Sequence, residues 1–127
     1  LQRLLNRLAG QVRKPAPLDL IQAGIGSEVR LVRVESVVYF EAEGRYTRVV
    51  HGDPGASGEV LIRTPLKELV GQLDPASFAQ IHRACIVNRR HIASAIRGDG
   101  GNMAVRLHGR AETLPVARHF QGLFPGA

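Results

Sequence analysis

The apolar positions from residue 18 onward recur mostly at every second residue, or in short runs bounded by glycine and proline, and this pattern predicts β-strands. Turn sequences at 24–27 (GIGS) and 43–45 (EGR) separate neighbouring strands. The sequence GDGGN at 98–102 is a strong hairpin signal, because glycine and asparagine adopt the backbone conformations of short turns. The predicted strands are 18–23, 28–34, 37–42, 46–50, 59–63, 92–97, 103–108 and 110–114, with a surface loop at 53–58.

The stretch FAQIHRACIVNRRHI, residues 78–92, places polar and basic residues on both sides of a short apolar run. That run, 85–87, is β-prone and is predicted to lie in a sheet. Asn88 follows it, where an amide side chain suits a turn or a helix cap. The basic residues then project from both ends of a rigid element, an arrangement suited to a polyanion. The alternative is a buried strand whose flanking arginines only solubilise it.

Residues 1–14 have helical periodicity, and Pro15 and Pro17 end the predicted helix. So short an amphipathic helix needs a surface to pack on. We interpret it as the end of a linker whose deletion leaves the domain folded. A dimerisation seam and a helix folded onto this domain are the alternatives. Its apolar stripe comprises Leu1, Leu4, Leu5, Leu8 and Val12.

Two further short helices are predicted. Thr64 and Pro65 open the first one, with threonine as the cap and proline at the first helical position. The second ends at the Pro125-Gly126 pair. The apolar faces comprise Leu66, Leu69, Val70 and Leu73 in the first helix, and Val116, Phe120, Leu123 and Phe124 in the second.

These elements predict one mostly β domain of roughly eight to ten strands with two or three short helices. The length of 127 residues and the hydrophobic content of 44% are ordinary for such a domain. No membrane span or signal peptide is visible, and the start at Leu1 rather than methionine predicts a fragment of a longer protein. The single cysteine, Cys85, fits a reducing cytoplasm and is predicted to be a small core residue.

The net charge of +6 and the pI of about 10.7 are typical of nucleic-acid binding, although an anionic membrane surface would also fit. Nearly all the cations are arginines, which bind phosphate or guanine with two parallel hydrogen bonds. The five histidines lack metal-site spacing, and His82 is interpreted as a hydrogen-bonded structural residue. No phosphate-binding loop, nucleophile motif or acid–base pair is present, so we expect no enzyme activity, no cofactor and no metal.

Four segments together resemble the LytTR-type DNA-binding domain of bacterial response regulators. They are VESVVYFEAEGRYTRVV (34–50), LIRTPLKELVGQL (61–73), FAQIHRACIVNRRHI (78–92) and LPVARHF (114–120). The resemblance covers about residues 18–124, and its most specific piece is F-x-x-I-H-R-x-x-I-V-N followed later by L-P-V-x-R. It implies an elongated, antiparallel, multi-sheet β fold that contacts DNA through loops and a short helix end.

Family members typically follow a phosphoaccepting receiver domain, so the resemblance implies that an upstream regulatory domain is missing from this chain. Residues 1–17 are then the linker helix and a Pro-rich connector, and 18–127 are the DNA-binding domain. By position, the resemblance implies DNA contacts by Thr47, Arg83 and Arg118. Many relatives carry a serine where this chain has Ala117, so a serine–phosphate contact is in question here.

Each of these residues also has a purely structural interpretation. Thr47 could be an outward strand residue, and Arg83 could form an ion pair with Glu41 or Glu43. Arg118 lies off the apolar face near a helix N-terminus, where a cation opposes the helix dipole, and this argues against a stabilising role. Asn88 is interpreted first as a cap and second as a DNA contact. The predicted phosphate contacts are Arg45, Arg48, Lys67, Arg89, Arg90 and His91.

The sequence therefore predicts the cytoplasmic, DNA-binding output domain of a two-component-type transcription regulator, specific for a double-stranded sequence. We expect two copies, a dimer on DNA, at adjacent repeated half-sites, and no membrane partner. The alternative is a basic β-domain that mediates protein–protein association through its N-terminal amphipathic helix.

Overall fold

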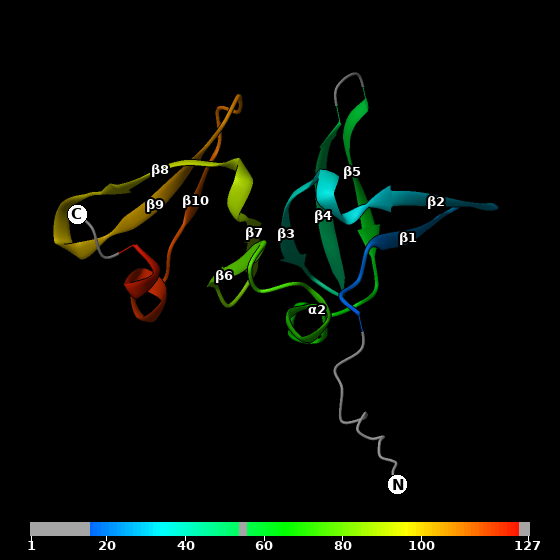
Figure 1. Cartoon of the computed structure of the whole chain (residues 1–127), viewed down its shortest axis with the longest axis horizontal. Helices are drawn as coiled ribbons and strands as arrows, with labels where there is room; N and C mark the ends of the chain where they lie inside the picture. Colours follow the sequence, from blue (N-terminus) through cyan, green and yellow to red (C-terminus); the bar gives the residue numbers. More distant parts are fainter. Residues whose placement is uncertain (1–15, 54–55, 125–127) are drawn as a thin grey trace, which may run out of the picture.

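The computed structural model describes residues 16–53 and 56–124, which form three antiparallel sheets in a row along the longest axis of the molecule (Figure 1). This confirms the predicted elongated, multi-sheet, mostly β fold. The helix predicted over 1–14 lies outside the described residues.

A two-stranded hairpin forms one end of the row. It consists of β1 (Leu20–Ile25) and β2 (Glu28–Arg33), joined through Gly26, whose φ of 63° favours glycine. The hairpin projects sideways from the rest of the molecule (Figure 1). Its inner face buries Ile21, Ala23 and Val32, so only one face of this sheet contributes to the core.

The central sheet has the strand order β5-β4-β3-β7-β6. Its strands are β3 (Val37–Glu43), β4 (Tyr46–Asp53), β5 (Ala56–Ile62), β6 (Phe78–His82) and β7 (Cys85–Asn88). The first four residues of β3, VVYF, are all buried, as expected for a strand that is covered on both faces. Short η1 (Val34–Ser36) leads into this sheet, and η2 (Arg89–His91) leads out of it.

The third sheet consists of β8 (Ile92–Arg97), β9 (Met103–Leu107) and β10 (Thr113–Pro115), in the order β10-β9-β8. A short turn, η3 (Asp99–Gly101), connects β8 to β9, and η4 (Arg118–Leu123) follows β10.

Two hydrophobic cores lie on the two faces of the central sheet. Phe40, Val49 and Leu69 belong to the core shared with β1, β2 and α2 (Leu66–Gln72). Tyr39, Val50 and Val87 belong to the core shared with the third sheet. The side chains of consecutive residues, such as Tyr39 and Phe40, enter opposite cores because neighbouring residues of a strand face opposite ways.

The helices differ from the sequence expectation in three respects. Pro65, not Thr64, occupies the N-cap of α2, and no side chain caps it. Val70 is 44% exposed, because α2 is short and only its Leu66, Leu69 and Leu73 side reaches the core. The last helix, η4, is a 3-10 helix, whose Leu123 is also exposed.

The observed strand boundaries differ from the predicted ones where backbone pairing between strands extends beyond the apolar pattern of the sequence. The β4 and β5 strands pair from Thr47↔Ile62 as far as Asp53↔Ala56, so most of the predicted 53–58 loop is strand. The last strand is Thr113–Pro115 rather than 110–114, because a turn at Gly109 (φ 68°) precedes it.

Candidate nucleic-acid interface

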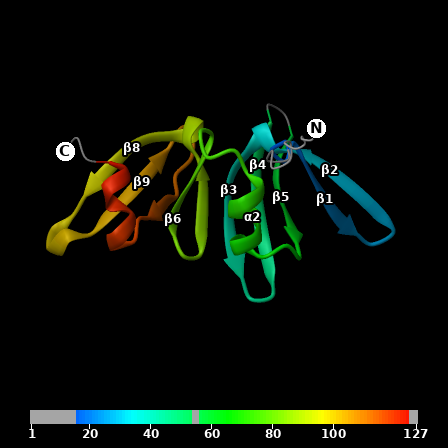
Figure 2. The same ribbon diagram turned by 60° about the horizontal axis from the view of Figure 1, so that its bottom comes forward.

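Three chain turns that hold exposed arginines lie along one long side of the molecule. Arg45 is in the β3–β4 turn, Arg83 is in the β6–β7 turn, and Arg118 begins η4. Figure 2 shows these turns and η4 along the lower edge of the view, and the two ribbon views agree in this placement (Figure 1). Cations at the ends of rigid strands on one side form a surface suited to a nucleic-acid backbone and its grooves.

Hydrogen bonds within the chain shape the β6–β7 turn around Arg83. The backbone N–H of Ala84 donates to Nδ1 of His82 at 3.1 Å, and the Ala84 carbonyl accepts from Ala42 N–H at 2.9 Å. The turn is thereby tied to β3, and the hydrogen-bonded structural role predicted for His82 is confirmed. Arg83 itself points to solvent.

Contacts with the η3 turn support Arg118. Gln121 Nε2 donates to the carbonyl of Gly101 at 3.0 Å. A Cβ placed on Gly101 would lie 3.6 Å from Nη2 of Arg118, so the guanidinium rests beside this glycine. Gly101 has a φ of 81°, which disfavours any side chain there. Sequence reasoning missed Gln121 and Gly101 as supporting residues; the GDGGN turn signal was the only pointer to them.

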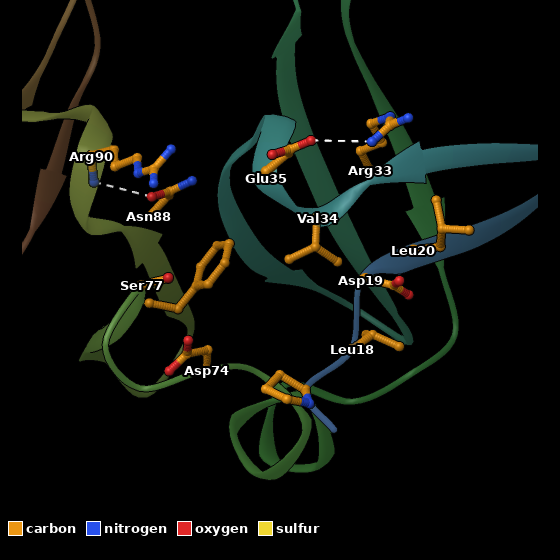
Figure 3. Close-up of a pocket in the computed structure, with 12 residues that line it drawn as sticks. Leu18, Asp19, Leu20, Arg33, Val34, Glu35, Asp74, Ser77, Asn88 and Arg90 are labelled. Carbon is orange, nitrogen blue, oxygen red and sulfur yellow. Dashed lines mark hydrogen bonds and ion pairs between the residues drawn. The ribbon is translucent and has the colours of Figure 1, made fainter. Parts of the chain in front are cut away.

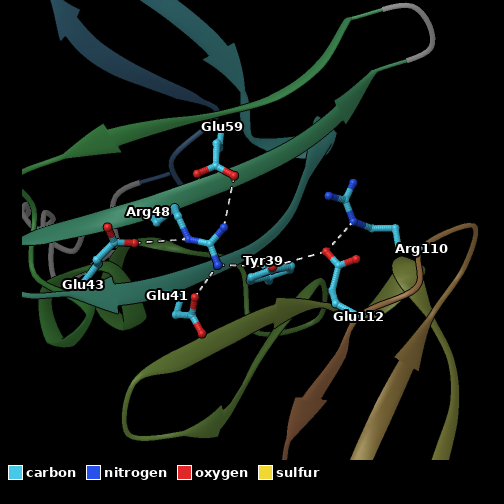
Figure 4. Close-up of polar contacts among 7 residues, drawn as sticks. All are labelled: Tyr39, Glu41, Glu43, Arg48, Glu59, Arg110 and Glu112. Atoms are coloured by element: carbon cyan, nitrogen blue, oxygen red, sulfur yellow. Dashed lines mark hydrogen bonds and ion pairs between the residues drawn. The ribbon is translucent and has the colours of Figure 1, made fainter.

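Arg48 does not fit the predicted phosphate contact, because carboxylates surround its guanidinium (Figure 4). It pairs with Glu41, with Glu43 at 3.4 Å and with Glu59 at 3.1 Å. The hydrogen bond with Glu41 is the main cause that raises the pKa of Arg48. These carboxylates would repel a phosphate, so Arg48 is a structural cation. Glu41 and Glu43, the ion-pair partners considered as the structural alternative for Arg83, are paired with Arg48 instead.

The same network links the central sheet to the third sheet (Figure 4). Tyr39 Oη donates to Glu112 Oε2 at 3.3 Å, and Arg110 Nε donates to that oxygen at 2.8 Å. Burial is the main cause that raises the pKa of Tyr39, whereas the hydrogen bond from Arg110 lowers the pKa of Glu112. This polar chain helps to hold the two sheets in one orientation.

Thr47 and Asn88 are buried, and their polar atoms have partners within the chain. Thr47 is 2% exposed, and its hydroxyl donates to the Thr64 carbonyl at 2.7 Å. Asn88 Nδ2 donates to the Val37 carbonyl at 2.8 Å, and its Oδ1 accepts from Arg90 N–H at 3.0 Å. The direct DNA contacts predicted for these two side chains therefore do not fit this structure, whereas the capping role predicted for Asn88 does. Both residues fix the backbone near the exposed cations.

The remaining basic residues divide between two sides. Lys67 is exposed on α2. Arg89, Arg90 and His91 form η2, at the opposite end of β7 from Arg83 and near the upper edge in Figure 2. His91 is half-buried, and burial, followed by the nearby His108 and Arg110 charges, lowers its pKa. The predicted phosphate contacts are thus not one cluster.

The chain is similar to several known proteins. The family model described as "LytTr DNA-binding domain" matches residues 27–124. An uncharacterized response regulatory protein of Vibrio cholerae is 41% identical over 113 residues, which are 87% of this chain and 42% of that protein. The positive alginate biosynthesis regulatory protein of Pseudomonas aeruginosa is 32% identical over 92% of this chain and 48% of its own length. The chain thus spans less than half of these relatives.

A solved structure has the same fold. It is the LytTr DNA-binding domain of a putative methyl-accepting/DNA response regulator from Bacillus cereus, with a TM-score of 0.72 and 21% identity, covering 84% of this chain and 94% of that one. No helix within the described ranges is long and apolar enough to cross a membrane. The family match over most of the chain shows that this chain belongs to the LytTr DNA-binding domain family, whose role is DNA binding in transcription regulation.

Proposed function

We propose that this domain binds double-stranded DNA in a sequence-specific manner, as the cytoplasmic output domain of a two-component-type transcription regulator. The observation that supports this best is the row of Arg45, Arg83 and Arg118 along one long side, each in a turn set by the sheets behind it. Turns on rigid strands hold their side chains in a fixed spacing, which base recognition requires.

In this proposal Arg83 and Arg118 enter the major groove. Both are exposed, and arginine can bind O6 and N7 of one guanine with two hydrogen bonds. Arg45, also exposed in its turn, and Lys67 on α2 hold the phosphate backbone on either side. These phosphate contacts give affinity and register but no base preference.

The η2 cations have a separate role in the proposal. Arg89 and Arg90 are exposed at the far end of β7, so they meet phosphates only if the duplex bends toward them. An elongated protein surface favours such bending, and the deformability of the DNA then adds to specificity.

Two copies of the domain occupy adjacent repeated half-sites. A single small domain buries limited DNA surface, so useful specificity needs a second copy on the same duplex. The relatives named as response regulatory and alginate biosynthesis regulatory proteins are about twice as long as this chain, which supports an upstream regulatory domain in the complete protein.

Selection of bound sequences from a random duplex pool tests the proposal directly. We expect an enriched motif that contains guanines, and binding that weakens steeply as salt rises, because phosphate contacts release counterions. The domain must then bind a duplex that contains the enriched motif more tightly than a scrambled duplex at every salt concentration. Enrichment of no motif, with salt-dependent binding to all duplexes, would reduce the proposal to non-specific DNA binding.

A further inference from the structure

The outer face of the β1–β2 hairpin is apolar and open. Val29 is 61% exposed, Leu31 is 58% exposed and Leu20 is 40% exposed. The register pairs Leu20 with Arg33, Gln22 with Leu31 and Gly24 with Val29, so the three apolar side chains share one face. The opposite face buries Ile21, Ala23 and Val32 in the core. A row of exposed branched side chains on a projecting hairpin is typical of an interaction surface.

A cavity of about 600 Å³ continues this face at the base of the hairpin (Figure 3). Leu20 and Arg33 belong both to the cavity wall and to the outer face, so the two form one continuous surface. Three carboxylates, from Asp19, Glu35 and Asp74, line the cavity together with the apolar side chains of Leu18, Val34 and Phe78. Arg33 and Arg90 line it as well, and Arg33 pairs with Glu35 at 3.2 Å.

The chain itself provides a segment of complementary chemistry. Residues 1–14 carry five apolar side chains on one helical stripe, four lysine or arginine side chains and no carboxylate. Two of these cations, Arg13 and Lys14, stand next to the connector that enters the cavity through Pro17 and Leu18. The apolar stripe therefore matches the hairpin face, and Arg13 and Lys14 match Asp19 and Asp74, whereas Glu35 already has Arg33 as a partner.

The dimensions also agree. A helix over residues 1–12 would be roughly 17 Å long at 1.5 Å per residue. The six-residue strand β1 is roughly 20 Å long at 3.3 Å per residue. The connector at 15–17 contains two prolines, and Leu18 after it is held beside α2, since its N–H donates to the Gln72 carbonyl at 2.8 Å.

We propose that the outer hairpin face and the cavity at its base bind residues 1–14 of the same chain as an amphipathic helix. The stripe of Leu4, Leu5 and Leu8 lies against Leu31 and Val29, while Arg13 and Lys14 meet the cavity carboxylates. The cavity lies beside η1 and η2, at the other end of β7 from Arg83, so a docked helix leaves the turns with Arg45 and Arg83 uncovered. Arg90 lines the cavity, so the inference is independent of the contacts proposed for Arg45, Arg83 and Arg118 but not of a phosphate contact by Arg90.

Disulfide trapping in the full chain tests it. The pair Leu8→Cys and Leu31→Cys should form an intrachain disulfide at least about tenfold faster than the control pair Leu8→Cys and Val70→Cys. An undocked N-terminal segment would give both pairs a similar effective thiol concentration, of order millimolar, and therefore similar rates. Docking raises the effective concentration only for the first pair. Val70 is similarly exposed but lies on α2, outside the proposed surface. Adding Leu4→Glu and Leu5→Glu should slow the first pair to the control rate.

Equal rates of disulfide formation for the two pairs would overturn the proposal. Disulfides that join two chains, seen on a non-reducing gel, would also overturn it, because they would assign the outer hairpin face to a second copy of the chain. Hydrogen exchange gives an independent measurement that leaves the folded core unaltered. In the Leu4→Glu, Leu5→Glu chain, the β2 amides from Val29 to Leu31 should exchange several-fold faster than in the parent, as local protection is lost. Unchanged exchange at β2, with an unchanged amide spectrum elsewhere, would also exclude a docked helix.

Discussion

The backbone N–H of Ala117 donates a 2.8 Å hydrogen bond to the carbonyl of Ile81. Ile81 stands two residues before Arg83, and Ala117 stands directly before Arg118. One backbone contact therefore couples the two proposed base-contacting arginines, although Arg83 lies in a turn of the central sheet and Arg118 follows the third sheet. Their relative position is set by the packing of η4 against β6, not by either turn alone.

Arg83→Ala and, separately, Arg118→Ala should each weaken binding to the cognate duplex by about tenfold or more, since a bidentate arginine–guanine contact provides roughly 1–3 kcal/mol of discrimination. Binding to scrambled DNA should weaken much less. Arg89→Ala is the matched control and should weaken both duplexes alike, with the salt slope lowered by about one unit. Titrations at several salt concentrations measure both effects. Equal losses on both duplexes for Arg83→Ala and Arg118→Ala would make these residues phosphate contacts.

The spacing of the two half-sites should matter as much as their sequence. Two copies on one side of the duplex need half-sites about one helical turn apart, so a change of about half a turn places them on opposite sides. We expect joint occupancy to fall for that spacing, in a mobility-shift assay that resolves one from two bound copies. The same occupancy at all spacings would indicate independent binding.

Thr47→Val should lower stability and leave DNA selectivity unchanged. The hydroxyl is buried and donates to the Thr64 carbonyl, so its removal should cost about 1–2 kcal/mol of unfolding free energy. Urea unfolding measures the loss, and the ratio of cognate to scrambled affinity provides the second readout. A lower ratio at unchanged stability would restore Thr47 as a direct contact.

Tyr39→Phe keeps the buried ring and removes the hydroxyl that bonds Glu112. The unfolding free energy should fall by about 1 kcal/mol, the usual net contribution of one hydrogen bond. Tyr46→Phe is the control, since Tyr46 is exposed and the same atom is removed there. If both variants lose the same stability, the link between the central and third sheets contributes nothing of its own.

Cys85 should resist alkylation in the folded protein. Burial is the main cause that raises the pKa of its thiol to about 12, and the residue is only 3% exposed. At pH 8 a shift of this size reduces the thiolate population roughly a thousandfold relative to an exposed cysteine. Iodoacetamide labelling should become fast only as urea unfolds the chain. Rapid labelling of the native protein would show that the β3–β7 pairing around Cys85 opens readily.

The local pattern of the sequence was sufficient for the strands and turns. Alternation and short apolar runs predicted the hairpin at 24–27, the buried β3 strand and the 98–102 turn, because each depends on neighbours close in the chain. The basic residues of the site were visible for the same reason, since charge is a property of composition.

Tertiary structure alone decided which of these residues can reach a ligand. Arg48 and Arg45 look equivalent in sequence, yet cross-strand register places three carboxylates around Arg48 and leaves Arg45 in an open turn. Thr47 became buried because its strand pairs with β5 and brings the Thr64 carbonyl within reach of its hydroxyl. Such contacts join residues far apart in the chain, so no local pattern could specify them.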